Sequence, residues 1–368
     1  MSAELYMRRA LLLARRAQGK TWPNPMVGAV LVRDGVVVGE GYHRKAGTAH
    51  AEVLALDAAG DKAAGADLYV TLEPCHCHGR TPPCTDKIQA AGVAQVFVGA
   101  CDPNPRECGA GIEVLRAAGV EVHAGLLEAE CMDLNRVYNR FIVDGRPFVR
   151  VKAACSLDGR MAPVSRDARW ISGKEARVFA HRLRSVSQAV CVGLGTVLQD
   201  DPALDVRHLR GKNPAVVVLD SKLRTPPDAH LLKLDRKAPV WIYHCQDAPK
   251  ARVAGLQAAG AELVRVPALD GRPDWLAVLR DLFGRGVYQL LVEGGAGVIG
   301  SLMEARLLDW LDLVLAPCLL GSNGVPVGIW DGPEKVASAP RLKAMRSRSL
   351  GPDLLVQGEV HWPEGGEA

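Results

Sequence analysis

The sequence His50-Ala51-Glu52, followed by Pro74-Cys75 and then Cys84, decides how the first part of this chain folds. The histidine and glutamate open a segment with helical apolar spacing, and Pro74-Cys75 follows a run of β-forming residues. One imidazole and two thiolates suit zinc, which in a catalytic site takes three protein ligands and a water molecule. The pattern predicts a zinc site with His50, Cys75 and Cys84 as ligands.

Glu52 is predicted to be the catalytic proton carrier rather than a ligand. The order His-x-Glu, Pro-Cys, Cys is that of the zinc nucleobase deaminases, in which the glutamate serves as general acid and base. Eight residues separate Cys75 from Cys84 in this chain, where the general form has two. A rival reading takes a closed structural zinc site from Cys75-His76-Cys77-His78 and Cys84, but it leaves His50 and Glu52 unexplained.

Bulk composition limits the classes of partner. The net charge is only +4, from 45 basic and 41 acidic residues, which argues against a nucleic-acid or membrane surface and favours a small-molecule substrate. No apolar run approaches the ~18 residues of a membrane span, and the N-terminus does not read as a signal peptide. Ten cysteines in such a chain are expected to be reduced thiols, so a cytoplasmic location is predicted.

The pattern around the motif is that of an α/β protein. A helix is expected over 3–18, followed by strands over 27–32 and 36–39. The dipeptide Asp34-Gly35 is typical of the turn of a hairpin and joins these two strands. Helices and strands then alternate along the chain. A polar helix is expected over 126–142, and Asp144-Gly145-Arg146-Pro147 marks a boundary between domains 1–145 and 146–368. Further strands are expected near 148–154, 189–193, 215–219, 240–244, 262–266, 289–292 and 312–316.

The first domain resembles the deaminase half of the bifunctional riboflavin-biosynthesis family RibD. The resemblance rests on Asn24-Pro25-Met26-Val27-Gly28, Gly41-Tyr42-His43, His50-Ala51-Glu52-Val53, Thr71-Leu72-Glu73-Pro74-Cys75, Gly79-Arg80-Thr81-Pro82-Pro83-Cys84 and Asp102-Pro103-Asn104-Pro105. The long gap that contains Gly-Arg-Thr-Pro-Pro is a feature of that family, so the unusual Cys75 to Cys84 spacing supports the resemblance.

The resemblance implies a cytidine-deaminase-like fold and a hydrolase activity. The substrate would be 2,5-diamino-6-ribosylamino-4(3H)-pyrimidinone 5′-phosphate, whose 2-amino group is replaced by oxygen while Glu52 carries the protons. The family's deaminase substrate contacts correspond to Asn24, His43, Arg80, Asp102 and Asn104. The chain departs from relatives at His76-Cys77, where they read Ser-His.

The second domain resembles the reductase half of the same family, whose fold is similar to that of dihydrofolate reductase. The resemblance rests on Lys152 to Arg160, Trp170-Ile171-Ser172, Gly193 to Leu198, Asp200 to Leu204 and Glu293-Gly294-Gly295. It implies an oxidoreductase that uses NADPH to reduce the ribosyl chain of the deaminated product to ribityl.

The same resemblance implies two sets of residues in the second domain. Cofactor positions correspond to Ala154, Trp170, Thr196, Asp200, Ser221, Gly295, Ala296, Gly297, Val298, Ile299, Gly300 and Ser301. Substrate positions correspond to Lys152, Ala168, Arg184, Leu204, Arg207 and Glu293. Ala168 stands where relatives usually have serine, and Met161 replaces a common threonine, so a weakened substrate contact is expected rather than a lost activity.

Gly295 to Gly300 also forms a literal G-x-G-x-x-G between a strand and a helix. In a Rossmann unit this motif follows the first strand, and an acidic residue ends the next strand. Here the motif comes late in its domain and the acidic residue is missing, so the motif favours phosphate binding in a fold of another kind. Close helix–strand packing is the alternative use of such glycines.

Two other functions stay open from the residues alone. One is a polynucleotide or free-base deaminase, against which the charge balance and the 5% aromatic content argue. The other is a zinc-stabilised binding protein without catalysis, against which the retained Glu52 argues. A homo-oligomer, either a dimer or a tetramer, is expected from the apolar α/β faces.

Overall fold

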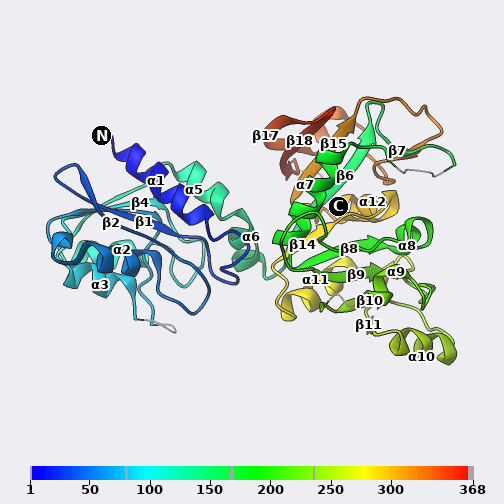
Figure 1. Cartoon of the computed structure of the whole chain (residues 1–368), viewed down its shortest axis with the longest axis horizontal. Coiled ribbons are helices and arrows are strands. Elements are labelled where there is room, and N and C mark those ends of the chain that lie inside the picture. The colour runs from blue at the N-terminus through cyan, green and yellow to red at the C-terminus, as the bar shows by residue number, and fades with distance from the viewer. Residues whose placement is uncertain (1, 79–81, 166–169, 235–236, 364–368) are drawn as a thin grey trace. The chain divides into compact units, whose positions relative to one another are not determined.

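The computed structural model describes residues 2–78, 82–165, 170–234 and 237–363. The chain forms two compact units, Met1–Arg146 and Pro147–Ala368 (Figure 1). Each unit is a mixed α/β structure, as the sequence predicts. Among the described residues, no helix combines the length and the apolar character needed to cross a bilayer.

The first unit is a five-stranded sheet with helices on both faces. Its elements are α1 (Ala3–Arg15), β1 (Gly28–Arg33), β2 (Val36–Tyr42), α2 (Ala51–Ala59), the 3₁₀ turn Gly60–Ala63, β3 (Asp67–Leu72), α3 (Cys84–Ala90), β4 (Gln95–Ala100), α4 (Ala110–Ala117), β5 (Glu121–Ala124), α5 (Glu128–Leu134) and α6 (Arg136–Asp144). The strand order is β2-β1-β3-β4-β5, with β3, β4 and β5 parallel and β1 antiparallel to both of its neighbours.

Both faces of this sheet are buried, which explains the continuous apolar sequence of β1. Ala29 and Leu31 pack in the core that includes α2 and α3, whereas Val30 and Val32 pack in the core that includes α1 and Cys131 of α5. The hairpin between β1 and β2 turns at Asp34-Gly35, both with positive φ, which confirms the turn expected from that dipeptide.

The single helix expected over 126–142 is wrong. The chain forms α5 and α6 instead, and Asn135 between them leaves helical geometry, with φ −106° and ψ 19°. The reason is tertiary: the Asn135 side chain accepts a hydrogen bond from the Met26 N–H (2.8 Å) and donates one to the Met26 carbonyl (2.9 Å).

The second unit is a nine-stranded sheet, again covered on both faces. Its elements are β6 (Phe148–Ser156), β7 (Arg160–Ala162), α7 (Lys174–Val186), β8 (Ala189–Gly193), α8 (Leu194–Asp200), β9 (Ala215–Leu219), α9 (His230–Lys233), β10 (Val240–His244), α10 (Lys250–Ala258), β11 (Ala261–Arg265), β12 (Ala268–Leu269), β13 (Arg272–Pro273), α11 (Trp275–Gly284), β14 (Gln289–Val292), α12 (Ala296–Glu304), β15 (Trp310–Ala316), β16 (Val325–Pro326), the 3₁₀ turn Val336–Ser338, β17 (Arg341–Leu350) and β18 (Asp353–His361). The main sheet has the order β11-β10-β9-β8-β14-β6-β15-β18-β17.

Seven neighbouring strands of this sheet, from β11 to β15, run parallel, and the hairpin β17–β18 extends it antiparallel. The seven parallel strands lie where the sequence predicts strands, although it does not predict their direction, and the hairpin was not expected. Because the carboxyl ends of parallel strands lie at one edge, the loops after β6, β8, β9 and β14 share that edge, where open α/β sheets bind ligands.

Close helix–strand contact in the first unit depends on Gly28. A Cβ at this position would lie 2.0 Å from the backbone oxygen of Ala10 in α1. We expect Gly28→Ala to lower the free energy of unfolding by about 1–3 kcal/mol, since the helix must move to admit the methyl group. Urea denaturation followed by circular dichroism measures the change.

Gly284→Ala is the matched control, because a Cβ there meets no atom within 4 Å. We expect this control to change stability by less than about 1 kcal/mol. Equal stability of Gly28→Ala and the unsubstituted chain would contradict the packing described for α1 and β1.

Candidate active sites

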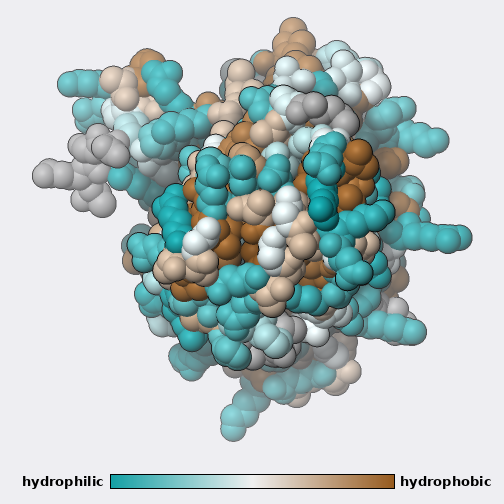
Figure 2. Space-filling view, turned by 90° about the vertical axis from the view of Figure 1, so that its left-hand side faces the viewer, coloured by the Kyte–Doolittle hydropathy of each residue, from teal (hydrophilic) through white to brown (hydrophobic). Residues whose placement is uncertain are grey.

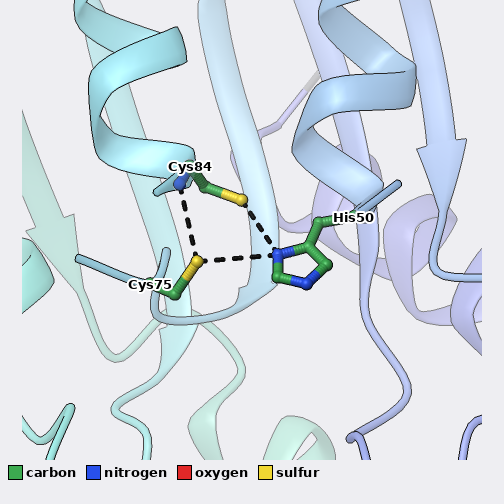
Figure 3. A group of neighbouring side chains, drawn as sticks. All are labelled: His50, Cys75 and Cys84. Carbon is green, nitrogen blue, oxygen red and sulfur yellow. Dashed lines mark hydrogen bonds between the residues drawn. The ribbon is translucent and has the colours of Figure 1, made fainter. Parts of the chain in front are cut away.

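The three predicted zinc ligands come together in the first unit. His50 directly precedes α2, Cys84 opens α3, and Cys75 lies in the loop after β3 (Figure 3). The Nδ1 atom of His50 lies 3.2 Å from the Cys84 sulfur and 3.6 Å from the Cys75 sulfur. A tetrahedral zinc ion with ordinary bond lengths would hold its nitrogen and sulfur ligands about 3.5 Å apart. The donor set therefore fits zinc in both chemistry and spacing.

The electrostatics of this group favour a thiolate. The Cys84 thiol, the His50 imidazole and the Cys84 backbone N–H all direct hydrogens at the Cys75 sulfur, which lowers the pKa of Cys75 to about 4. The same interaction with Cys75 raises the pKa of Cys84, so the two thiols share one proton between them. Zinc replaces such a proton when it binds thiols.

Glu52 lies beside this group on the first turn of α2 and is 3% exposed. Burial raises the pKa of its carboxyl group. Among the described residues, its Oε2 atom has no hydrogen-bond partner. A buried polar atom without a partner is costly in a folded protein, and it commonly marks a catalytic group.

A pocket of about 450 Å³ adjoins these residues, and four of the five predicted substrate contacts line it: Asn24, His43, Asp102 and Asn104. The fifth, Arg80, lies outside the described residues. His43 is fixed in one tautomer: its Nδ1 donates to the Ala49 carbonyl (3.2 Å) and its Nε2 accepts from the Asn24 amide (3.1 Å). Burial lowers the pKa of His43, which also favours the neutral ring.

Asp102 is held by a residue that the sequence did not single out. The Tyr138 hydroxyl of α6 donates to both carboxylate oxygens of Asp102, at 2.9 and 3.2 Å, and the Asn104 N–H donates to one of them at 2.9 Å. Burial raises the pKa of Asp102 to about 6, although these two donors act in the opposite direction.

Glu73 is the second positioning residue that was missed. Its buried carboxylate accepts four backbone N–H bonds, from Asp102 (3.1 Å), Gly109 (3.0 Å), Gly111 (2.9 Å) and Ile112 (3.2 Å). Glu73 therefore ties the 102–112 segment to the strand end that leads into Cys75. The available signal in the sequence was an acidic residue between the end of an apolar strand and Pro74.

A second cavity, of about 950 Å³, lies at the carboxyl edge of the parallel strands in the second unit. It is lined by the predicted positions Lys152, Ala154, Thr196, Asp200, Ser221, Glu293, Gly295, Ala296, Gly297, Val298, Ile299 and Ser301. The cavity thus collects most of the predicted cofactor residues from β6 itself and from the segments that follow β8, β9 and β14.

The glycines of the 295–300 segment serve two purposes. Gly295 donates its N–H to the Thr196 hydroxyl (3.2 Å), and a Cβ on Gly297, in the first turn of α12, would meet no atom within 4 Å. Backbone open to a cavity at a helix N-terminus suits phosphate. Gly300 instead supports packing, because a Cβ there would lie 1.8 Å from the Ile329 carbonyl oxygen.

Arg184 and Glu293 contact each other, with Nε–Oε1 and Nη2–Oε2 distances of 2.6 and 2.7 Å. Burial alone would raise the pKa of Glu293, but Arg184 and Lys152 outweigh it and hold that pKa below its ordinary value. Burial lowers the pKa of Lys152, which Glu293 partly offsets. Lys152 and Glu293 therefore line the cavity as a buried pair of opposite charge, and Arg184, which is not among the lining residues, contacts Glu293.

Four other predicted positions are not among the residues that line this cavity. Gly300 packs against the Ile329 segment, and the Leu204 residue is buried, with 2% of its surface exposed. Arg207 forms an ion pair with Asp205 at 2.5 Å. Trp170 has 69% of its surface exposed, and the Arg177 guanidinium lies 4.7 Å from the centre of its ring. Ala168 lies outside the described residues.

Two family models match the chain, one to each unit. Residues 1–100 match the cytidine and deoxycytidylate deaminase zinc-binding region, and residues 147–356 match the RibD C-terminal domain. Zinc and NADPH are the cofactors that fit these two matches.

Relatives that match nearly the whole chain belong to the same family as these two models indicate. The riboflavin biosynthesis protein RibD of Bacillus amyloliquefaciens is 41% identical over 95% of this chain and 94% of its own length. The solved structure of Acinetobacter baumannii RibD is 36% identical with a TM-score of 0.83, and each chain is covered to 97% or more.

A third relative states both activities. The crystal structure of a diaminohydroxyphosphoribosylaminopyrimidine deaminase/5-amino-6-(5-phosphoribosylamino)uracil reductase from Thermotoga maritima is 34% identical, covers 97% of this chain and 98% of its own, and has a TM-score of 0.82. The resemblance expected from the sequence is thereby confirmed over both units. The chain belongs to the RibD family of riboflavin biosynthesis, bifunctional enzymes with a zinc-binding deaminase domain and a reductase domain.

Proposed function

We propose that residues 1–145 deaminate 2,5-diamino-6-ribosylamino-4(3H)-pyrimidinone 5′-phosphate, and that residues 146–368 reduce the ribosyl chain of the product to ribityl with NADPH. The observation that carries the first half is the buried Oε2 atom of Glu52, which has no hydrogen-bond partner among the described residues and lies beside a zinc-type donor set. The second half is supported by the cavity at the carboxyl edge of the sheet.

Glu52 carries the protons of the deamination. Zinc held by His50, Cys75 and Cys84 would supply an activated water molecule near neutral pH. The Oε2 atom of Glu52 would accept one proton from the attacking water and pass it to the ring nitrogen. It would then accept a second proton from the hydroxyl group added to the ring carbon and pass it to the amino group, which leaves as ammonia. The raised pKa of Glu52 suits this task, because a group that both takes and gives a proton works best with a pKa near the working pH.

The surrounding polar residues orient the pyrimidine. His43, fixed as a neutral ring, holds the Asn24 amide toward the pocket, while Tyr138 and Glu73 hold Asp102 and Asn104. Such prearranged groups bind substrate without first losing conformational freedom. The face in Figure 2 carries separate hydrophobic groups among hydrophilic residues.

The reductase roles follow from the charges around the second cavity. NADPH would supply the hydride, with phosphate groups at Gly295 and Gly297 and the Thr196 hydroxyl nearby. Lys152 and Glu293 stand on the same wall: Lys152 is the group able to donate a proton, and the Glu293 carboxylate can accept hydrogen bonds from the sugar hydroxyls. Arg184 acts through Glu293, whose carboxylate it orients in a bidentate pair.

A cytoplasmic location and a homo-oligomeric state belong to the same proposal. All ten cysteines are free thiols, as is usual in a reducing compartment. β17 is the last strand of the nine-stranded sheet, and it exposes Met345 along that edge. An uncovered edge strand is a common place for a second copy to bind.

Glu52→Gln tests the proton carrier. We expect deaminase kcat to fall by about 10²–10⁴-fold, because glutamine cannot exchange the proton, while zinc content stays unchanged. Ammonia release and metal analysis measure the two effects. Glu113→Gln, on the exposed side of α4, is the control and should keep the full rate. A Glu52→Gln enzyme that deaminates at the normal rate would refute this role.

Tyr138→Phe tests the link between Asp102 and the pH profile. With an Asp102 pKa of about 6, deaminase kcat/KM should decline as the pH falls through that value, because the protonated carboxyl group no longer accepts both hydrogen bonds. The Tyr138 hydroxyl lowers this pKa, so its removal should move the acid limb to higher pH.

Tyr6→Phe is the matched control for this shift, since its hydroxyl bonds to the Gly35 carbonyl instead. Its acid limb should coincide with that of the unsubstituted chain. If the limb of Tyr138→Phe also stays in place, Asp102 does not govern the profile.

Gly297→Val tests the cofactor site without disturbing the fold, since the added atoms would enter the cavity. We expect NADP⁺ to bind about tenfold or more weakly in calorimetry, with an unchanged deaminase rate. Gly284→Val, away from the cavity, should bind NADP⁺ normally. Unaltered NADP⁺ affinity in Gly297→Val would place the cofactor elsewhere.

A further inference from the structure

The tripeptide Cys75-His76-Cys77 sends its side chains to two different groups. Cys75 joins His50 and Cys84, whereas His76 and Cys77 lie with Glu107, from the loop that precedes α4. The donor atoms of His76, Cys77 and Glu107 all lie within 4.8 Å of one another. The rival four-ligand site drawn from this dense stretch is thus replaced by two separate three-donor groups.

We propose that His76, Cys77 and Glu107 form a second zinc site at the rim of the deaminase pocket. The three donors are an imidazole, a thiol and a carboxylate, all of which bind zinc in proteins. Each side chain is partly exposed, so an ion can reach the site from solvent. With three protein donors, water completes the coordination, and this site is the weaker of the two.

The spacing needs one adjustment, at Cys77, to hold one ion. The Nδ1 atom of His76 lies 2.9 Å from Oε2 of Glu107 and 4.0 Å from the Cys77 sulfur, which lies closer to Nε2, at 3.3 Å. Tetrahedral zinc on Nδ1 would place the oxygen and the sulfur about 3.3 and 3.5 Å from that nitrogen, so the Cys77 side chain must turn from Nε2 toward Nδ1 to share the ion. The contact between His76 and Glu107 accounts for two of the donors but does not explain the thiol beside them.

Local hydrogen bonds prearrange the carboxylate. The Oε2 atom of Glu107 also accepts the backbone N–H of His76 at 3.1 Å, and the Glu107 N–H bonds to the Asn104 carbonyl at 2.9 Å. The loop is therefore fixed at both ends of the site before any ion binds. A prearranged donor set loses less conformational entropy on binding.

The site should affect the deaminase and not the reductase. Cys77 and Glu107 line the same pocket as His50 and Glu52. An ion held by Cys77 and Glu107 would occupy part of that pocket and narrow the space left for substrate. Excess zinc is then an inhibitor of deamination that leaves the second unit unaffected.

Equilibrium dialysis of the full chain against buffered free zinc, followed by metal analysis, tests the proposal. The unsubstituted chain should bind zinc in two steps, to two ions per chain, and Cys77→Ser and Glu107→Gln should each bind one. Cys108→Ser, at the exposed neighbouring cysteine, is the control and should bind two. His50→Ala should lose the tighter step and keep the weaker one.

One zinc ion per chain at saturation in the unsubstituted protein would overturn the proposal. So would two ions in both Cys77→Ser and Glu107→Gln. A second experiment measures, for each protein, the rate of ammonia release with excess zinc divided by the rate without it. This ratio should be several-fold below one in the unsubstituted chain and near one in Cys77→Ser. Equal falls in both proteins would also contradict the proposal. The deaminase rate without added zinc reports separately on the function of the first unit.

Discussion

The deaminase pocket depends on the convergence of His50, Cys75 and Cys84, which enter from the start of α2, a loop after β3 and the start of α3. Two helices can bring their first residues to one strand end only if both lie close on the same face of the sheet. Small residues allow this approach: a Cβ on Gly39 or Gly41 of β2 would lie within 2.3 Å of a backbone oxygen of α2. The packing of α2 against the sheet is therefore a condition for zinc binding, not a separate matter of stability.

Buried polar side chains hold the loops around that convergence point. Hydrogen bonds fix two segments there: Asn135 holds the loop at Met26, and Glu73 and Tyr138 hold the segment from Asp102 to the start of α4. Each buried polar group would cost free energy if it were unpaired, so these residues are stabilising only with the loops in place. Loop position and domain folding are consequently coupled in the first unit.

Much of this arrangement could be predicted from the sequence, and the exceptions have physical causes. The apolar strands and the His-x-Glu, Pro-Cys, Cys order carry strong local signals. The break at Asn135 has none, because the residues on either side favour helix and a contact with Met26 overrides them. The strand β17 is mostly exposed and rich in arginine and serine, so it lacks the alternating apolar pattern of a buried strand. The pairing of Arg184 with Glu293 joins residues 109 positions apart. Leu204, with φ +51°, turns into the core for reasons that no local pattern expresses.

The central claim is that one chain performs two successive reactions with separate sites. A single coupled assay tests it most directly: the purified chain receives the diaminopyrimidinone phosphate, first without and then with NADPH, while ammonia and NADPH are followed separately. The account predicts ammonia release in the absence of NADPH, followed by NADPH oxidation equal in amount to the ammonia already released. NADPH oxidation without prior ammonia release, or no ammonia release by zinc-loaded protein, would contradict it.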